Sequence, residues 1–244
     1  MTYVDAGGIR TWYDVLGEGD PVVMLHPGGF DARAMADPAA ALAGSYTVFL
    51  PDRRGHGRTP DVPGELSFEV MGADTAAFIE TVVGGPAHVV GHSDGAIVGL
   101  LTAFQRPDLV RSLVFASGVW HHTGWLPGVL DVDDETRDFM RSWYVEVSPD
   151  GPDHFAEVAA KSERMHHVSP ALTVEDLRTI SVPTLVMAGD EDEMPVEHLA
   201  ELHRALPDAQ LAIVPGAGHA VLLDKPELCT MMIKDRLEGT PVVA

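Results

Sequence analysis

Basic residues are scarce in this chain of 244 residues. It contains 16 Lys and Arg against 37 Asp and Glu, which gives a formal net charge of −21 at pH 7. Nucleic acids and anionic membrane surfaces are bound by clusters of Lys and Arg, so we expect neither among the partners of this protein. The negative charge favours solubility and leaves both a monomer and a homodimer open.

Cysteine and long apolar runs are also scarce. Cys229 is the single cysteine, which excludes an internal disulfide, and its apolar neighbours at 231–233 predict a buried structural thiol. No segment approaches the about 18 consecutive apolar residues of a membrane-spanning helix. Residues 1–5 lack the basic start and apolar run of a secretory signal, which predicts a cytoplasmic protein.

Short apolar runs alternate with segments of helical periodicity along the chain. Residues 2–4 and 9–15 are rich in Tyr, Val, Ile and Trp, and the Gly7-Gly8 pair between them predicts an antiparallel hairpin. The later apolar runs are typical of parallel strands covered on both faces, and the periodic segments between them of helices. The runs are 22–25, 48–50, 89–90, 113–115, 185–188 and 211–214, and the helical segments include 73–83, 95–105 and 196–206. This alternation predicts a doubly wound α/β sheet.

One interval, 119–180, breaks the alternation. It has no β-type run, it is rich in aromatic residues, and it contains the acidic stretch 131–135. So long a connection in a compact domain usually has structure of its own or acts as a lid, so we predict a helical cap insertion. Residues 1–118 and 181–244 then form the core, with a frayed tail at 241–244.

The strongest chemical signal is the segment Gly-His-Ser-Asp-Gly at 91–95. It follows the predicted strand at 88–90 and precedes a predicted helix, which is the strand–turn–helix setting of a G-x-S-x-G nucleophile. Glycines on both sides let the strand and helix backbones approach, so that the Ser93 hydroxyl projects from the carboxyl edge of the sheet. The alternative, a glycine-rich turn that happens to contain a serine, does not account for this setting.

A serine hydroxyl needs a base, and the base needs a carboxylate to orient it. His219 lies in a glycine-rich loop after the last apolar strand, and Asp192 lies in an acidic loop after the strand at 185–188. Asp190 is expected to fix the turn there, and the neighbouring glutamates to cap the next helix or face water. The paired histidines within 119–180, at 121–122 and 166–167, are interpreted as solvated side chains, and no metal site is expected.

With these residues in place, the chain resembles the α/β-hydrolase-fold serine hydrolases over nearly its whole length. Ser93, Asp192 and His219 follow one another in that family's order, and Gly189-x-x-Asp192 resembles its acid motif. The segment 52–59 resembles its Asp-x-Arg-Gly-x-Gly-x-Ser loop, with Thr59 in place of Ser. The resemblance implies a mostly parallel eight-stranded sheet with helices on both faces, a small helical cap, and acyl transfer to a serine.

The resemblance also implies an oxyanion hole. The segment His-Pro-Gly-Gly at 26–29 resembles the family's His-Gly segment, but Pro27 stands where Gly is usual and has no N–H. The first donor is therefore expected to be the N–H of Gly28, with Gly29 as a fallback. The second is the N–H of Asp94, the residue after the nucleophile.

The side chain of Asp94 is unusual because it lies beside the place where negative charge develops. One explanation is that it caps the helix or is paired internally, since a carboxylate in the first turn is stabilised by the helix dipole. The other is that it binds a substrate amine, and Gly-x-Ser-Asp-Gly segments resemble those of valacyclovir-hydrolase-like α-amino-acid ester hydrolases. The sequence leaves both open.

The expected activity is hydrolysis of small carboxylic esters without a cofactor, as in a carboxylesterase of class EC 3.1.1. Trp120, Trp125 and Trp143 are expected to line the substrate pocket together with Asp94. Nothing resembles a dinucleotide-binding or P-loop motif. Lactones, thioesters and C–C bonds remain possible substrates of the same triad, and a non-catalytic small-molecule receptor is a more distant alternative.

Overall fold

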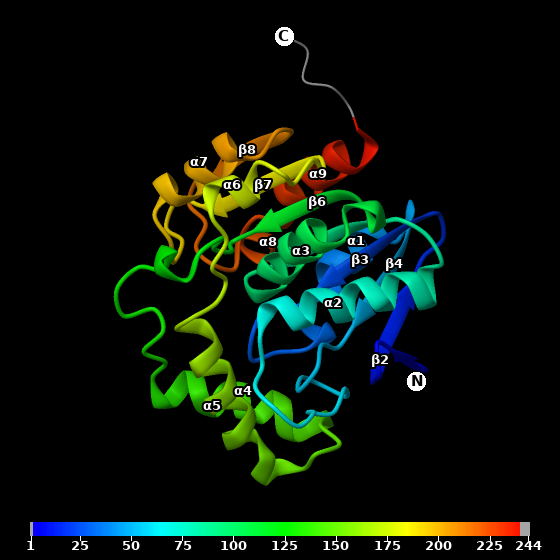
Figure 1. Cartoon of the computed structure of the whole chain (residues 1–244), viewed down its shortest axis with the longest axis vertical. Helices are drawn as coiled ribbons and strands as arrows, with labels where there is room; N and C mark the ends of the chain where they lie inside the picture. Colours follow the sequence, from blue (N-terminus) through cyan, green and yellow to red (C-terminus); the bar gives the residue numbers. More distant parts are fainter. Residues whose placement is uncertain (1, 240–244) are drawn as a thin grey trace.

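The computed structural model describes residues 2–239, and the tail expected at 241–244 lies outside them. It confirms the predicted eight-stranded sheet with helices on both faces (Figure 1). The strands are β1 (Thr2–Ala6), β2 (Ile9–Leu16), β3 (Asp20–Leu25), β4 (Tyr46–Pro51), β5 (Ala87–His92), β6 (Val110–Ala116), β7 (Thr184–Gly189) and β8 (Ala209–Val214). Among residues 2–239, none of the helices combines the length and apolar character needed to cross a bilayer.

The sheet order is β1-β2-β4-β3-β5-β6-β7-β8. β1 pairs antiparallel with β2, and β2 with β4, while the neighbours from β4 to β8 all pair in parallel. The carboxyl ends of β5, β6, β7 and β8 therefore lie at one edge. In an open α/β sheet, ligands bind in the crevice outside this edge.

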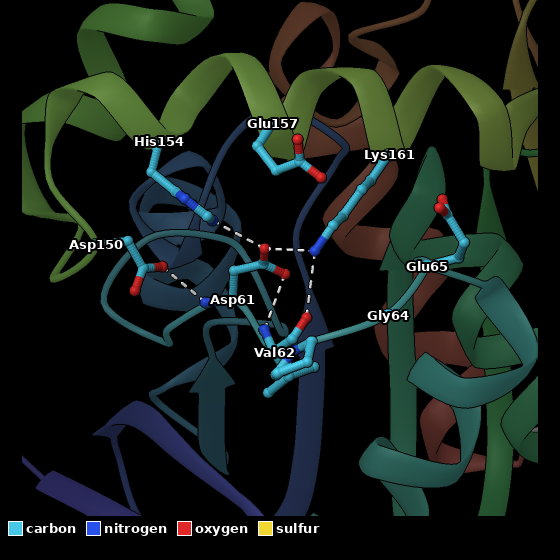
Figure 2. A pocket seen from close by; sticks show the side chains of 9 residues that line it. Asp61, Val62, Gly64, Glu65, Asp150, His154, Glu157 and Lys161 are labelled. Atoms are coloured by element: carbon cyan, nitrogen blue, oxygen red, sulfur yellow. Dashed lines mark hydrogen bonds and ion pairs between the residues drawn. The ribbon is translucent and has the colours of Figure 1, made fainter.

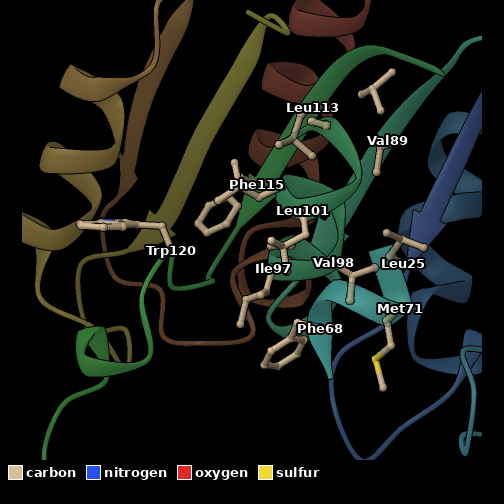
Figure 3. Close-up of a cluster of buried hydrophobic side chains, with 14 of the residues drawn as sticks. Leu25, Phe68, Met71, Val89, Ile97, Val98, Leu101, Leu113, Phe115 and Trp120 are labelled. Carbon is tan, nitrogen blue, oxygen red and sulfur yellow. The ribbon is translucent and has the colours of Figure 1, made fainter. Parts of the chain in front are cut away.

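Buried side chains alternate between the two faces along the central strands. In β3, Val22 and Met24 belong to one core cluster, and Val23 and Leu25 to the other. Because both faces are covered, residues on both sides of a central strand are mostly apolar. Figure 3 shows one of these faces, where Leu25 packs among side chains of the covering helices.

The helices cover the faces in two groups. α2 (Phe68–Phe78), α3 (Asp94–Gln105) and α7 (Val196–Ala205) contribute to the cluster of Figure 3. On the other face lie α1 (Ala36–Leu42), α8 (Val221–Asp224) and α9 (Pro226–Glu238), which buries the Cys229 thiol as predicted. The helix predicted at 73–83 begins earlier, because the Ser67 side chain accepts a hydrogen bond from Val70 N–H, and its last part is the π-helical turn η2 (Ile79–Val83).

Between β6 and β7 the chain forms α4 (Asp134–Val147), α5 (Phe155–His166) and α6 (Val174–Leu177), with short 3₁₀ turns. α4 and α5 lie to one side of the sheet (Figure 1) and are called the cap below. Asp61, on a core loop, fixes α5: its carboxylate accepts hydrogen bonds from Lys161 Nζ at 2.7 Å and His154 Nε2 at 2.9 Å (Figure 2). Asp61 and Lys161 are both buried, so the cap is held by an ion pair largely shielded from water.

Helix and sheet approach each other most closely at Gly95, in the turn between β5 and α3. A Cβ at this position would collide with the carbonyl oxygen of Leu25, in β3. We expect Gly95→Ala to lower the free energy of unfolding by about 3 kcal/mol or more, because strand and helix backbones would have to separate. Urea unfolding measures this. Gly44→Ala, at an exposed turn with open space around the glycine, is the matched control and should stay near the wild type.

Candidate active site

Ser93 stands at the sharp turn between β5 and α3. Its φ of 56° and ψ of −122° are rare for a residue with a side chain. The turn is held by Ser93 N–H, which donates to the carbonyl oxygen of Ala116 on β6 at 2.8 Å. This backbone geometry places the Ser93 hydroxyl outside the carboxyl edge of the sheet, as the sequence predicts.

Three side chains from three loops meet at this edge. His219 Nε2 lies 2.9 Å from Ser93 Oγ, and His219 Nδ1 lies 2.7 Å from Asp192 Oδ1. Asp192 follows β7, and His219 follows β8. The structure thus brings together the three residues that the sequence singled out, in the geometry of an activated nucleophile, its base and the carboxylate that orients the base.

Both carboxylate oxygens of Asp192 accept hydrogen bonds. Oδ1 also accepts the N–H of Glu193 at 2.7 Å, and Oδ2 accepts the hydroxyl of Ser117 at 2.6 Å. Ser117 lies just after β6 with a φ of 56°, and its contact with Asp192 spans 75 residues. The sequence analysis did not single it out. Asp190 fixes the loop of His219 instead, because its Oδ1 accepts the N–H of Gly216 at 2.7 Å.

Burial and neighbouring charges determine the protonation states of His219 and Asp192. Burial disfavours the imidazolium of His219, but the hydrogen bond to Asp192 and the charges of Glu193, Asp192 and Asp94 outweigh it, so the His219 pKa is raised above 6.5. Burial disfavours the charged form of Asp192 as well, yet the hydrogen bond and charge of His219 lower its pKa below 3.8. Asp192 therefore stays ionised wherever His219 titrates.

The loop expected to supply the oxyanion hole is fixed by a neutral histidine. His26 Nδ1 donates to the carbonyl oxygen of Pro27 at 2.8 Å, and its Nε2 accepts the N–H of Arg53 at 3.0 Å. Burial and the charge of Arg53 hold the pKa of His26 well below 6.5, so it remains neutral. Because the Pro27 carbonyl is tied down in this way, the Gly28 backbone is held beside the turn of Ser93, against the Asp94 side chain.

Asp94 is buried, with 2% of its surface exposed. Its Oδ1 accepts a hydrogen bond from His166 Nε2 at 2.8 Å, and His166 comes from α5 of the cap. The interpretation of His166 as a solvated histidine was wrong: its side chain is 16% exposed, because the end of α5 turns it toward the sheet edge. Of the explanations left open for Asp94, the structure favours the internally paired one.

A cavity of about 980 Å³ opens between the catalytic edge and the cap. Ser93, Asp94, His219, Gly28 and Gly29 line its floor. Its walls are mainly aromatic and aliphatic, and they include Phe30, Trp125, Val129, Phe139, Met140 and Trp143. Charged side chains also line the cavity, among them Asp131, Arg137 and Glu193.

Two of the three tryptophans expected in the pocket line it, and one does not. Trp125 and Trp143 line the cavity, and the Trp125 ring lies edge-on to His219, with 6.2 Å between centroids. Trp120 does not line it: the ring is buried at the edge of the cluster in Figure 3, stacked on His198 at 5.0 Å. Trp120 Nε1 donates to the His198 carbonyl at 3.1 Å, which satisfies its polar end within the core.

The sheet order, the nucleophile turn and the three-residue hydrogen-bond chain define an α/β-hydrolase. The family model described as "Alpha/beta hydrolase family" matches residues 22–230, and the chain belongs to this family. The chain is therefore assigned to the hydrolases.

Similar proteins span nearly the same length. A protein of Azorhizobium caulinodans that carries the provisional name carbamate hydrolase RutD is 28% identical, over 96% of this chain and 97% of its own. The 2-hydroxy-6-oxo-6-(2'-aminophenyl)hexa-2,4-dienoic acid hydrolase of Metapseudomonas resinovorans is 25% identical, over 92% of this chain and 86% of its own. Among solved structures, a serine hydrolase involved in carbazole degradation, the CarC enzyme, has a TM-score of 0.80 at 24% identity, covering 97% of this chain and 98% of that one.

Proposed function

We propose that this protein is a cofactor-independent serine hydrolase that cleaves carboxylic esters of small molecules through a Ser93–His219–Asp192 triad. The observation that carries the proposal is the continuous hydrogen-bond chain from Ser93 Oγ through His219 to Asp192, at the floor of a largely apolar cavity. The proposed partner is a small ester-like molecule, with no role for nucleic acid, a membrane or a metal. We further propose a cytoplasmic monomer or homodimer.

In the proposed reaction, His219 Nε2 takes the proton of Ser93 Oγ as the oxygen attacks the ester carbonyl. The tetrahedral oxyanion is stabilised by the N–H groups of Gly28 and Asp94, since the N–H of the first helical residue has no intrahelical acceptor. The imidazolium, oriented by Asp192, then gives its proton to the departing alkoxide, which leaves an acyl-serine. A water that loses a proton to His219 attacks this ester. As the second tetrahedral intermediate collapses, the His219 imidazolium gives that proton to Ser93 Oγ, which releases the acid and regenerates Ser93.

The substrate range has two further candidates that specific observations support. One relative is named a carbamate hydrolase and another a hydrolase of a 2-hydroxy-6-oxo-dienoic acid, so both substrate types belong in the test. An α-amino-acid ester is the weaker candidate, because the Asp94 carboxylate that would bind its amine already pairs with His166. Lactones and thioesters can be cleaved by the same triad and are the remaining candidate substrates.

A matched substrate panel tests the proposal. We expect p-nitrophenyl butyrate to be hydrolysed with a higher kcat/KM than the p-nitrophenyl N-alkylcarbamate of the same chain length or a 2-hydroxy-6-oxo-dienoate. L-valyl and 3-methylbutanoyl esters of one alcohol differ only in the amine, and we expect no preference for the amine. A higher kcat/KM for the carbamate or the dienoate would replace the ester assignment, and a strong amine preference lost in Asp94→Asn would restore Asp94 as a substrate ligand.

The pH dependence follows from the raised pKa of His219. Only the neutral imidazole accepts the Ser93 proton, so lowering the pH through a pKa above 6.5 removes the base. We expect kcat/KM for p-nitrophenyl butyrate, a substrate without ionisable groups, to rise with pH through a midpoint above 6.5. Initial rates from about pH 5 to 9 measure this, with the Ser93→Ala variant as background. A kcat/KM that shows no rise with pH anywhere in this interval would contradict the assignment of His219 as the base.

A further inference from the structure

A buried contact joins the cap to the residue beside the nucleophile. His166, at the end of α5, meets Asp94 through the 2.8 Å hydrogen bond, across 72 residues of sequence. The same imidazole packs edge-on against Phe68, the first residue of α2, at 5.3 Å between centroids. The proposed mechanism uses only the backbone N–H of Asp94, so neither this carboxylate nor His166 has yet been assigned a role.

Both ring nitrogens of His166 face oxygen atoms. Nδ1 lies 2.7 Å from the Ser162 carbonyl oxygen, and Nε2 lies 2.8 Å from Asp94 Oδ1. A carbonyl and a carboxylate only accept, so the two bonds together require both N–H groups of an imidazolium. Burial works against this charge, but Asp94 outweighs it and raises the pKa of His166 above 6.5, while the pKa of Asp94 falls to about 2.

Two other ionisable groups face the pair from the core. Arg53 is buried and contributes positive charge, but its Nη2 donates to the Pro27 carbonyl at 3.1 Å. His56 is buried with a pKa lowered to about 4 by desolvation and by Arg53, so it is neutral. Arg53 therefore contributes charge without a hydrogen bond to Asp94, and His166 is the cation that also hydrogen-bonds to the Asp94 carboxylate.

The other oxygen of this carboxylate lies at the oxyanion loop. Asp94 Oδ2 is buried without a hydrogen-bond partner among the described residues, and a Cβ added to Gly28 would collide with it. Negative charge on Asp94 thus lies next to both proposed oxyanion donors. In a desolvated site, an unneutralised carboxylate there would oppose the charge that develops in the transition state.

We propose that His166 is a positioning residue of the hydrolase: its imidazolium neutralises and orients the Asp94 carboxylate so that the oxyanion hole can accept negative charge. Because His166 belongs to the cap, the hole is electrostatically complete only when α5 is seated on the core. This inference rests on the proposed function, since it assumes an oxyanion formed at Ser93. The Asp61–Lys161 contact holds the same helix in place five residues earlier (Figure 2).

A double-mutant cycle tests the proposal. His166→Gln keeps a donor toward Asp94 and removes the positive charge, so we expect kcat for p-nitrophenyl butyrate to fall about 10- to 100-fold with KM little changed. Asp94→Asn removes the negative charge, and its kcat is the reference rate for the cycle. The His166→Gln/Asp94→Asn double variant removes both charges of the hydrogen-bonded pair, and kcat should recover to near that of Asp94→Asn.

Recovery of kcat in the double variant would distinguish an electrostatic role of His166 from a purely structural one. His122→Gln, elsewhere in the insertion and outside the cavity lining, is the matched histidine control and should be unchanged. A His166→Gln variant as fast as the wild type, or a double variant as slow as His166→Gln, would overturn the proposal. The proposed function is tested separately by Ser93→Ala. A loss of activity in that variant supports the triad, and it does not depend on the result of the double-mutant cycle. Wild-type activity retained in Ser93→Ala would instead refute the triad.

Discussion

Replacing Ser93 with Ala is expected to abolish covalent labelling by a fluorophosphonate and to lower kcat for p-nitrophenyl butyrate by about 10⁴-fold or more. The alanine removes the atom that attacks the carbonyl, and the hydroxyl of Ser93 is the one that lies within hydrogen-bond distance of His219 in the described residues. Intact-protein mass after labelling and steady-state kinetics measure the two effects.

The control for Ser93→Ala is Ser45→Ala, which changes an exposed serine and should leave labelling and kcat as in the wild type. An adduct that persists on folded Ser93→Ala protein would show that the nucleophile lies elsewhere. No adduct and no turnover with the folded wild type would instead favour the alternative of a small-molecule receptor with the hydrolase fold.

Asp192→Asn is expected to lower kcat by about 10⁴-fold with little change in KM. The carboxylate accepts the His219 Nδ1–H at 2.7 Å, and an amide nitrogen in that place would donate to Nδ1 instead. The imidazole would then carry its proton on Nε2, facing Ser93 Oγ, and could not accept the serine proton. Steady-state kinetics with p-nitrophenyl butyrate measure both constants.

Asp190→Asn provides a matched control in the same loop. Asp190 accepts the N–H of Gly216 at 2.7 Å, and the Asn oxygen can accept the same bond, so activity should stay within about threefold of the wild type. Equal losses in Asp190→Asn and Asp192→Asn would contradict the assignment of Asp192 as the carboxylate that orients His219.

Much of the fold and of the catalytic edge could be predicted because the signals are local. A strand covered on both faces is mostly apolar, so β3, β5 and β7 are visible in the sequence as short apolar runs. The turn around Ser93 requires glycine where helix and strand backbones meet, and Gly95 lies against the Leu25 carbonyl for this reason. The boundary of α2 was missed by five residues, because the predicted start at 73 overlooked the capping side chain of Ser67.

The long-range contacts could not be predicted in this way. Ser117 looks like any serine after a strand, yet it donates to Asp192 across 75 residues. Trp120 and Trp143 are equally aromatic in sequence, but one stacks on His198 in the core and the other lines the cavity. Whether each tryptophan faces the cavity depends on the path of the chain after β6 and on the orientation of α4 about its axis. Neither is determined by the residues next to the tryptophan.

The sequence by itself determined the sheet, the order of the three residues proposed for catalysis and the loops that carry them, because strand burial and turn geometry act over a few residues. Only the tertiary structure decided the electrostatics around Asp94. A histidine near the end of an amphipathic helix has the same sequence pattern whether it faces water or a carboxylate. The seating of α5 on the core places His166 against Asp94, and in that buried setting the two charges stabilise each other.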